Sequence, residues 1–217
     1  MSRFNYIIFD LDGTLSDSKE GITKSVQYAL KKVGIIEENL DNLNHFVGPP
    51  MVEEYRKTYG MSEEKAYETL HYYRERYVPT GIYETKIYPG VMEILESVKQ
   101  KGLRIGMATS KPKGMAIEVA KYLEIKDYFD IICGADLHGP IQSKASVLNK
   151  LFENSTFKKE ESVLIGDTKF DVEGANQVGI DSIGVSWGTG TKEEMKDHGA
   201  VEVFDDYKSL IKYFTGE

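Results

Sequence analysis

The sequence predicts an α/β protein, with a doubly wound, mostly parallel, Rossmann-like sheet as its core and a small all-helical cap domain inserted after the first strand. Two observations lead to this prediction. Short apolar runs alternate with helical patterns over most of the chain, as in strand–helix–strand units. One long segment near the amino end instead contains helical patterns only. With 217 residues, the chain is long enough for one large domain and part of a second.

Five apolar runs predict the strands of the sheet. They are continuous rather than alternating, which is typical of parallel strands that are buried on both faces. Between them, apolar residues at 3.6-residue spacing predict helices around residues 91–98 and 116–123. The apolar runs cover residues 6–10, 104–109, 130–134, 162–167 and 182–186.

Residues 16–89 predict the helical insert, because no strand-like run occurs there. An apolar stripe over residues 22–33 indicates one helix, and Gly34 would end it. Asp17 and Glu20 have the spacing of a capping box at the start of this helix.

Two further signals divide the insert. Gly48-Pro49-Pro50 breaks the chain, and Ser62 is placed to cap a helix that runs toward Val78. The segment returns to the alternating pattern after Pro89. The predicted domains are a core of residues 1–15 and 90–217 and a cap of residues 16–89.

The composition limits the classes of function. The net charge of −8 argues against a broad basic surface for nucleic acid. The single cysteine, Cys133, excludes an internal disulfide and a four-cysteine zinc site, and it suits a reducing compartment. No targeting segment and no apolar stretch of membrane-spanning length are visible. We therefore expect a cytoplasmic protein, monomeric or weakly dimeric, that binds neither a nucleic acid polymer nor a membrane.

Two carboxylates follow the first predicted strand. Asp10 and Asp12 are two residues apart, so on extended backbone they point to the same side. They would lie just beyond the carboxyl end of the strand, where open α/β sheets bind ligands. Gly13 allows a sharp turn at this point. An acidic loop with a helix-capping aspartate is the alternative interpretation.

A second acidic pair, Asp167 and Asp171, follows the fourth predicted strand. A helix cap with an acidic first turn is the alternative interpretation here. Both pairs would lie at the same edge of one parallel sheet, where like charges a few ångströms apart repel by about 4 kcal/mol per pair. The four carboxylates therefore need a cation. Oxygen ligands without a histidine or cysteine cluster favour Mg²⁺.

Residues 10–15 (DLDGTL) resemble the first motif of the haloacid dehalogenase superfamily of phosphohydrolases. The other motifs of this superfamily have matches in the same order. Thr109 and Ser110 resemble the second motif, Lys144 the third and residues 166–171 the fourth. The helical insert lies where a cap follows the first motif in this superfamily. Residues 48–50 resemble the Gly-Pro-Pro in caps of its phosphoglycolate-phosphatase-like and nucleotidase-like members.

The resemblance implies a role for each matched residue. Asp10 would attack phosphorus and form an aspartyl-phosphate. Asp12 would protonate the leaving alcohol and then deprotonate the water that cleaves the intermediate. Mg²⁺ would be held by the carboxylates of Asp10 and Asp167 and by the backbone carbonyl of Asp12. Asp171 would be a further ligand or would orient the others.

The resemblance also assigns the phosphate-binding groups. Thr109, Ser110 and Lys144 would neutralise the oxygens of the transferred phosphoryl group. Lys144 departs from the family pattern, because members often have proline after this lysine and here Ala145 follows. Lys111 is a nearby competitor for the same role. For either lysine, a solvent-exposed position is the alternative.

The cap contains residues that would contact a substrate. Eight tyrosines lie within residues 55–88; they would stack on a nucleobase, grip a sugar or pack inside the cap, and we expect packing for most of them. Arg56, Arg74 and Arg76 would bind a carboxylate or a second phosphate of the substrate, or lie on a solvated helix face.

We therefore expect a Mg²⁺-dependent phosphatase that acts on a small phosphorylated metabolite, such as phosphoglycolate or a nucleoside 5′-monophosphate. A phosphomutase that reuses the aspartyl-phosphate is one alternative, although mutases that resemble this family tend to have valine where this chain has Thr14. A receiver-like signalling module is an alternative of another class. Such a module would need neither Asp12 as acid and base nor a helical cap of this size.

Overall fold

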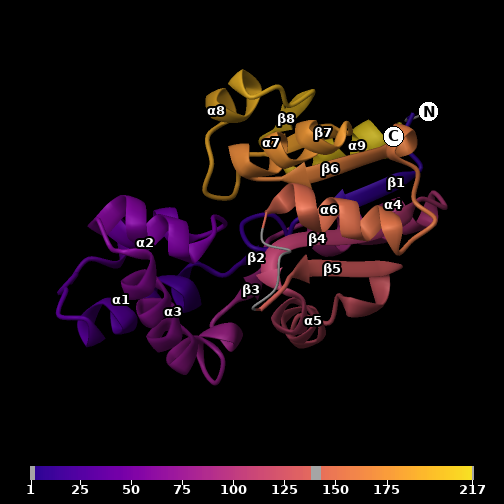
Figure 1. Ribbon diagram of the computed structural model, residues 1–217. Coiled ribbons are helices and arrows are strands. Elements are labelled where there is room, and N and C mark those ends of the chain that lie inside the picture. Colours follow the sequence, from indigo (N-terminus) through magenta and orange to yellow (C-terminus); the bar gives the residue numbers. More distant parts are fainter. Residues whose placement is uncertain (1–2, 138–142, 217) are drawn as a thin grey trace.

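The computed structural model describes residues 3–137 and 143–216. Figure 1 shows a sheet with helices on both faces and a group of helices beyond the edge where the central strands end. The sheet has six strands in the order β5-β4-β1-β6-β7-β8, and all neighbouring strands are parallel. The predicted fold class is therefore confirmed. The strands are β1 (Tyr6–Phe9), β4 (Arg104–Pro112), β5 (Ile131–Ala135), β6 (Ser162–Gly166), β7 (Asp181–Val185) and β8 (Glu202–Phe204).

The five predicted strands are all present, and β8 is an addition at one side of the sheet. Its three residues are too few to form an apolar run that stands out in the sequence. Helices α4 and α5 lie where apolar spacing predicts them. The helices packed on the sheet are α4 (Val91–Gln100), α5 (Lys113–Tyr122), α6 (Lys144–Glu153), α7 (Lys169–Val178), α8 (Lys192–Asp197) and α9 (Tyr207–Thr215).

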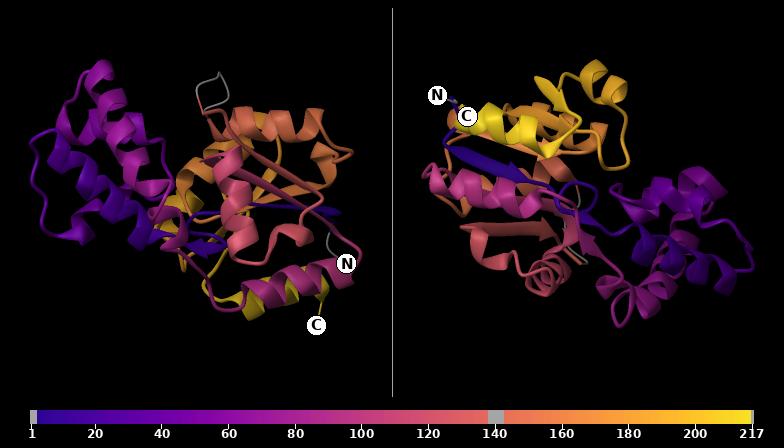
Figure 2. Two further views of the ribbon diagram at one scale, coloured as in Figure 1. Left: turned by 90° about the horizontal axis from the view of Figure 1, so that it is seen from below. Right: turned by 180° about the vertical axis from the view of Figure 1, so that it is seen from behind.

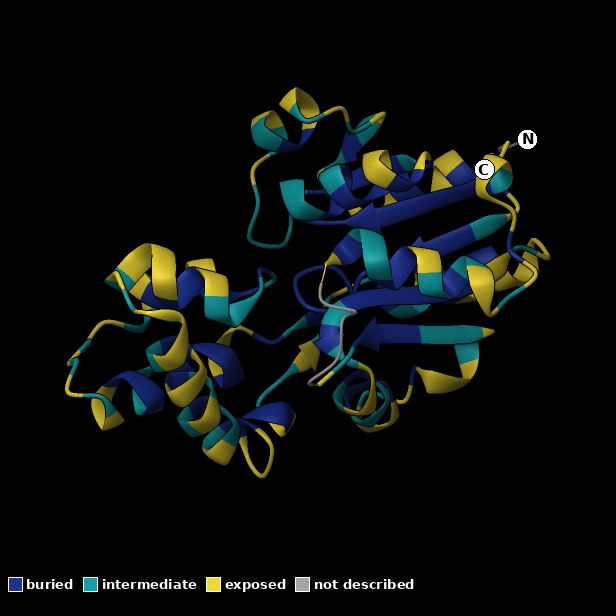
Figure 3. Cartoon of the chain, viewed as in Figure 1, coloured by how far each residue is buried: buried dark blue, intermediate teal, exposed yellow. Residues whose placement is uncertain are grey.

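Both faces of the central strand β1 are covered. Ile7 and Phe9 join an apolar cluster with side chains of α4, α5 and α9, whereas Ile8 joins a second cluster with side chains of α6 and α7. All three residues are buried. Figure 3 shows the strands of the sheet mostly in dark blue and the outward sides of the helices in yellow. Burial on both faces explains why the strands form continuous apolar runs in the sequence.

The insert is mostly helical, but the prediction that it contains no strand is wrong. Strand β2 (Ser16–Asp17) pairs antiparallel with β3 (Lys86–Ile87), where the chain enters and leaves the helical part. Strands of two residues leave no pattern in a sequence. Figure 2 shows from two sides that the cap is joined to the sheet here. The helices of the cap are α1 (Lys19–Lys32), α2 (Met51–Tyr59) and α3 (Glu63–Tyr77), with 3₁₀ segments at Leu40–Phe46 and Gly81–Tyr83.

The two predicted helix starts in the cap have different outcomes. Helix α1 has no capping box: Asp17 belongs to β2, and Ser18 takes the cap position without a side-chain hydrogen bond to the helix. Ser62 caps α3 as predicted, because its hydroxyl accepts a hydrogen bond from the Lys65 backbone N–H at 3.2 Å. Within residues 3–137 and 143–216, no helix has the length and apolar character needed to cross a membrane.

Candidate active site

Asp10 and Asp12 lie just beyond the carboxyl end of β1. The backbone N–H of Asp10 donates to the Ile165 carbonyl of β6 at 2.9 Å, and both acidic side chains are buried. The chain then turns at Gly13, whose φ of +90° favours glycine. A Cβ atom at residue 13 would overlap the carboxylate of Asp167. The two acidic loops therefore approach closely because residue 13 has no side chain.

The carboxylates of Asp10, Asp167 and Asp171 form a buried cluster. Each offers one oxygen, and these oxygens lie within 4.8 Å of one another. The carboxylate of Asp12 pairs with Lys111 at 2.8 Å instead; the family resemblance gives Asp12 a metal contact through its backbone carbonyl. Three buried carboxylates, without a nitrogen or sulfur ligand in the group, fit the oxygen ligands that Mg²⁺ prefers.

Asp167 is held by a loop that follows β7. Its Oδ2 accepts hydrogen bonds from the Thr189 backbone N–H at 2.8 Å and from the Thr189 hydroxyl at 3.0 Å. Its Oδ1 accepts from the Thr14 hydroxyl at 3.2 Å. A Cβ atom at Gly188 or Gly190 would overlap Asp167. The contacts of Thr14 and Thr189 with Asp167 were not predicted from the sequence; the glycines on each side of Thr189 are the signal that points to a close approach.

Asp171 both caps helix α7 and faces the cluster. Its Oδ2 accepts hydrogen bonds from the Thr168 backbone N–H at 3.1 Å and from the Thr168 hydroxyl at 2.9 Å. Its Oδ1 accepts from the ammonium of Lys144 at 2.8 Å. The capping interaction therefore fixes the carboxylate that contacts Lys144.

Lys144 is the first residue of α6 and reaches into the cluster. Its ammonium donates to an Asp10 oxygen at 2.7 Å and to the Ala108 carbonyl at 3.0 Å, as well as to Asp171. The side chain is 5% exposed, so the solvent-exposed alternative is wrong for this lysine. Gly174 on α7 leaves room for it, because a Cβ atom there would lie 2.6 Å from the Lys144 Cβ.

Burial changes the pKa values of the cluster. It raises the pKa of Asp10 to about 6, although the Lys144 ammonium opposes the shift. Burial and the neighbouring Asp171 carboxylate raise the pKa of Asp167 to about 7. Burial by itself would lower the pKa of Lys144. The negative charges of Asp10 and Asp171 have the larger effect, so the pKa of this lysine is raised. The cluster thus holds three carboxylates and one ammonium, which contacts Asp10 and Asp171, and a bound cation would offset the remaining negative charge.

The raised pKa of Asp167 predicts a pH-dependent loss of stability in the metal-free protein. In the folded state this carboxyl keeps its proton up to about pH 7, whereas in the unfolded chain it ionises near 3.8. Between these values the folded state holds more protons, so the free energy of unfolding falls as the pH rises. Denaturation in a chelator should therefore show the wild type losing a few kcal/mol relative to Asp167→Asn between about pH 4 and pH 7.

The comparison with Asp167→Asn isolates this carboxyl from the other titrating groups. Mg²⁺ should restore more stability to the wild type than to the variant, because a cation that binds only the folded state stabilises it. A stability difference between the two proteins that does not change with pH would contradict the prediction.

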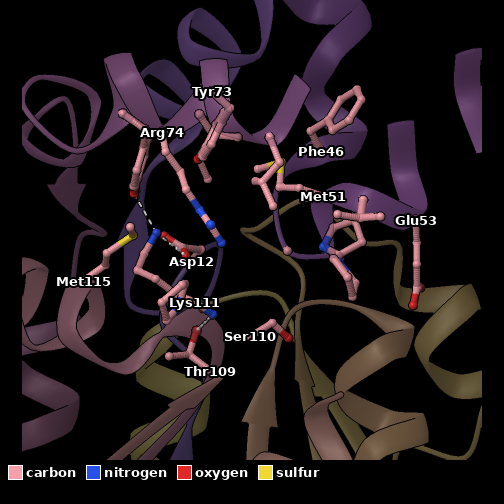
Figure 4. A pocket seen from close by; sticks show the side chains of 18 of the residues that line it. Asp12, Phe46, Met51, Glu53, Tyr73, Arg74, Thr109, Ser110, Lys111 and Met115 are labelled. Carbon is pink, nitrogen blue, oxygen red and sulfur yellow. Dashed lines mark hydrogen bonds and ion pairs between the residues drawn. The ribbon is translucent and has the colours of Figure 1, made fainter. Parts of the chain in front are cut away.

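A cavity of about 550 Å³ lies between this edge of the sheet and the cap. Asp10, Asp12, Thr109 and Ser110 line it from the core. The Thr109 side chain is buried, and its hydroxyl accepts a hydrogen bond from the Lys111 backbone N–H at 3.2 Å. The structure therefore brings the predicted phosphate-binding pair beside the predicted nucleophile. Figure 4 shows Asp12, Thr109, Ser110 and Lys111 facing Phe46, Met51, Tyr73 and Arg74 across this space.

The three cap arginines separate into two groups. Arg76 forms ion-paired hydrogen bonds with Glu84 at 2.8 and 3.0 Å and lies outside the cavity lining. Arg56 and Arg74 line the cavity. Burial lowers the pKa of Arg74, and its guanidinium donates to the Leu137 carbonyl at 3.3 Å. Arg74 has no ion-pair partner within the described part of the chain, and Figure 4 shows it directed from α3 into the cavity.

The cap tyrosines also have different positions. Tyr55, Tyr73 and Tyr77 are buried in the apolar core, as expected for packing. Tyr67 and Tyr83 are 56% and 42% exposed. Tyr67, Tyr73 and Tyr77 line the cavity as well, so packing and substrate contact are not exclusive alternatives here.

The fold and the site together define a class of protein. It is an α/β enzyme whose sheet presents a buried carboxylate cluster and a lysine at its carboxyl edge, below a cavity that a helical cap covers. Such a centre suits the transfer of an anionic group with the help of a cation.

Comparisons with known proteins identify the family. The model of the haloacid dehalogenase-like hydrolase family matches residues 7–185. A 5′-nucleotidase from Pseudomonas aeruginosa is 38% identical over 208 residues, which are 96% of this chain and 94% of that protein. Tyrosine-protein kinase PtkA from Mycobacterium tuberculosis is 36% identical over 184 residues, which are 85% of this chain and 62% of that protein. The crystal structure of a predicted phosphatase from Clostridium acetobutylicum has a TM-score of 0.95 and 39% identity, with 99% of each chain covered.

The chain belongs to the haloacid dehalogenase-like hydrolase family. It is an enzyme of the phosphatase class within this family and acts on phosphorylated substrates. The resemblance that the sequence motifs suggested is thereby confirmed. Membership in a family of hydrolases argues against the receiver-like alternative.

Proposed function

We propose that the protein is a Mg²⁺-dependent phosphomonoester hydrolase that acts on a small phosphorylated metabolite through an aspartyl-phosphate on Asp10. One observation supports this proposal above the others. The buried carboxylate of Asp10 accepts a hydrogen bond from the Lys144 ammonium. Asp10 also lines the same cavity as Asp12, Thr109 and Ser110. A nucleophile, an acid and donors for the phosphoryl oxygens thus surround one space.

In the first step, Asp10 attacks the phosphorus of the substrate. Lys144 bonds Oδ1 of Asp10, which leaves Oδ2 to form the new bond to phosphorus. The bond from phosphorus to the ester oxygen breaks, and Asp12, which enters this step protonated on Oδ1, gives that proton to the departing alcohol. Thr109 and Ser110 donate to the phosphoryl oxygens, and the positive charge of Lys144, held beside Asp10, helps to neutralise these oxygens as charge moves between them.

In the second step, Asp12 removes a proton from water, and this water attacks the phosphorus of the aspartyl-phosphate. The bond between Asp10 and phosphorus breaks, which releases phosphate and regenerates the carboxylate. Asp10, Asp167 and the Asp12 carbonyl would hold Mg²⁺, with Asp171 beside them. When bound, Mg²⁺ supplies positive charge for the carboxylates and for the phosphoryl oxygens.

The cavity supports a small organic phosphate as the substrate. Its volume of about 550 Å³ exceeds what a phosphate alone needs. Its cap side combines apolar and aromatic side chains with Arg56 and Arg74. This lining suits an alcohol that carries a planar or an anionic group, as in a nucleoside 5′-monophosphate or phosphoglycolate.

A screen for phosphate release tests the proposed function. Purified protein is assayed against nucleoside monophosphates, phosphoglycolate and sugar phosphates, with and without Mg²⁺, and Asp10→Asn is the blank. We expect Mg²⁺-dependent phosphate release from at least one of these esters. A sugar phosphate that is converted to an isomer without phosphate release would show a mutase and would contradict hydrolysis. No phosphate release from any ester in the presence of Mg²⁺ would contradict it as well.

Replacing Arg74 with methionine should weaken substrate binding. The guanidinium faces the cavity and has no ion-pair partner within the described residues, so it is available to an anionic substrate. A hydrogen bond to a charged group contributes about 1.5–3 kcal/mol, so we expect KM to rise by about 10- to 100-fold and kcat to change much less. Steady-state kinetics with the best ester of the screen measure both constants.

Lys65→Met is the matched control for Arg74→Met. Lys65 also lies on α3, but it pairs with Glu68 at 2.9 Å and does not line the cavity. Its replacement should leave KM unchanged. A KM for Arg74→Met that equals the wild-type value would exclude contact between Arg74 and the substrate.

A further inference from the structure

The ammonium of Lys111 connects the core to the cap at the site. It lies 2.8 Å from Oδ2 of Asp12 and donates a hydrogen bond to the Tyr77 hydroxyl at 2.6 Å. It also lies 4.7 Å from the centre of the Tyr77 ring. The Lys111 side chain is 5% exposed, so the solvent-exposed alternative is wrong for this lysine as well.

The three residues come from separate parts of the fold. Lys111 lies near the end of β4, Asp12 in the loop after β1, and Tyr77 at the end of α3 in the cap. Tyr77 is itself held in place, because its ring stacks on Tyr73 with centroids 5.0 Å apart. Figure 4 shows the dashed contacts that run from the cap through Lys111 to Asp12. The ammonium is therefore shared between a cap residue and the predicted acid.

The contact with Lys111 leaves one of the two side-chain oxygens of Asp12 available to a substrate. Lys111 occupies Oδ2, whereas Oδ1 is buried and has no hydrogen-bond partner within the described residues. Asp12 lines the cavity. Buried carboxylate oxygens almost always have a partner in proteins, so an unpartnered one beside a substrate cavity indicates a partner that arrives with the substrate.

We propose that Lys111 is a positioning residue which, together with Tyr77 of the cap, holds the carboxyl group of Asp12 through Oδ2, so that the proton on Oδ1 faces the leaving oxygen of the substrate. The inference rests on the proposed function, in which Asp12 is the acid of the first step. Displacement of the cap removes Tyr77 from Lys111 and loosens this arrangement. Proton donation to the alcohol is thus coupled to the position of the cap.

The dependence of rate on the leaving group tests this proposal. Ethyl phosphate needs a proton on its departing oxygen, whereas 4-nitrophenyl phosphate releases a stable phenolate that hardly needs one. For Lys111→Met we expect kcat/KM to fall by about 100-fold with ethyl phosphate and by no more than a few-fold with 4-nitrophenyl phosphate. Tyr77→Phe keeps the ring and loses only the hydroxyl, so it should show the same pattern with a smaller fall of about tenfold.

Two further variants complete the test. Lys111→Arg keeps a cation near Asp12 and should restore part of the activity on ethyl phosphate. Lys113→Met is the matched control, because Lys113 is exposed two residues further along and does not line the cavity. It should behave like the wild type with both esters.

Three outcomes would overturn the positioning role. Equal losses on both esters in Lys111→Met and Tyr77→Phe would indicate a structural role only, and unchanged kcat/KM on both esters would indicate no role. If Lys111→Met does not fold, the test rests on Tyr77→Phe alone. An equal loss of kcat/KM with both esters in Tyr77→Phe then overturns the proposal. Failure of the proposed function is distinguishable from all of these, because the wild type would then release no phosphate from any ester of the screen or from these two esters, or Asp10→Asn would remain active.

Discussion

Asp10→Asn should lower kcat for phosphate release by at least about 10⁴-fold with every ester that the wild type hydrolyses. The amide of asparagine has nearly the shape of the carboxylate but does not attack phosphorus. The variant should still fold, because Asp171 remains an ion-pair partner of Lys144 and the side-chain oxygen of asparagine can accept the hydrogen bond that Asp10 accepts from this lysine. Phosphate release at saturating substrate and denaturation curves in a chelator measure the two effects.

Asp197→Asn is the matched control for this substitution. Asp197 is exposed at the end of α8 and belongs to neither the carboxylate cluster nor the cavity lining. Its variant should have wild-type activity. If Asp10→Asn instead kept activity within tenfold of the wild type, Asp10 would not be the nucleophile.

Lys144→Met should lower kcat by about 10²- to 10³-fold. The ammonium contacts both Asp10 and Asp171, and in the proposed first step it also faces the phosphoryl oxygens. Removal of one partner from a buried ion pair typically costs about 3–5 kcal/mol, so the metal-free variant should also be less stable. Mg²⁺ should restore part of the stability but not the rate, because the missing contact to Asp10 is direct.

Lys150→Met separates this effect from a general effect of losing a lysine on α6. Lys150 lies on the same helix and pairs with Asp136 at 3.0 Å, but its side chain is 33% exposed and does not line the cavity. Its variant should keep wild-type kcat. Similar losses of kcat in the two variants, or a Lys144→Met enzyme with normal turnover, would contradict the role of Lys144.

The elements that could be predicted from the sequence are those with a repeated apolar pattern. Strand β1 is buried on both faces, so Ile7, Ile8 and Phe9 form a continuous run. Strands β2, β3 and β8 have two or three residues each and leave no such run. They form because the chain around them brings their backbones together.

The candidate site also has a part that the sequence predicts and a part that it does not. Convergence of Asp10, Asp167 and Asp171 follows from topology alone, because β1 and β6 are neighbouring parallel strands that end at one edge. The partners of Lys111 do not follow from any local pattern. Its burial depends on Tyr77, which the cap brings from 34 residues away in the chain. No spacing in the sequence specifies where the end of a cap helix meets the end of a core strand.

The most direct test of the proposed mechanism is to identify the residue that becomes phosphorylated. Asp12→Asn lacks the base of the second step, so the intermediate should accumulate when this variant is mixed with 4-nitrophenyl phosphate and Mg²⁺. After an acid quench, borohydride reduction and digestion, mass spectrometry locates the modified residue. We expect homoserine at position 10, formed only with substrate and absent after treatment with hydroxylamine. A burst of phenolate without modification of Asp10, or a phosphoryl group on serine, histidine or tyrosine, would contradict the proposed mechanism.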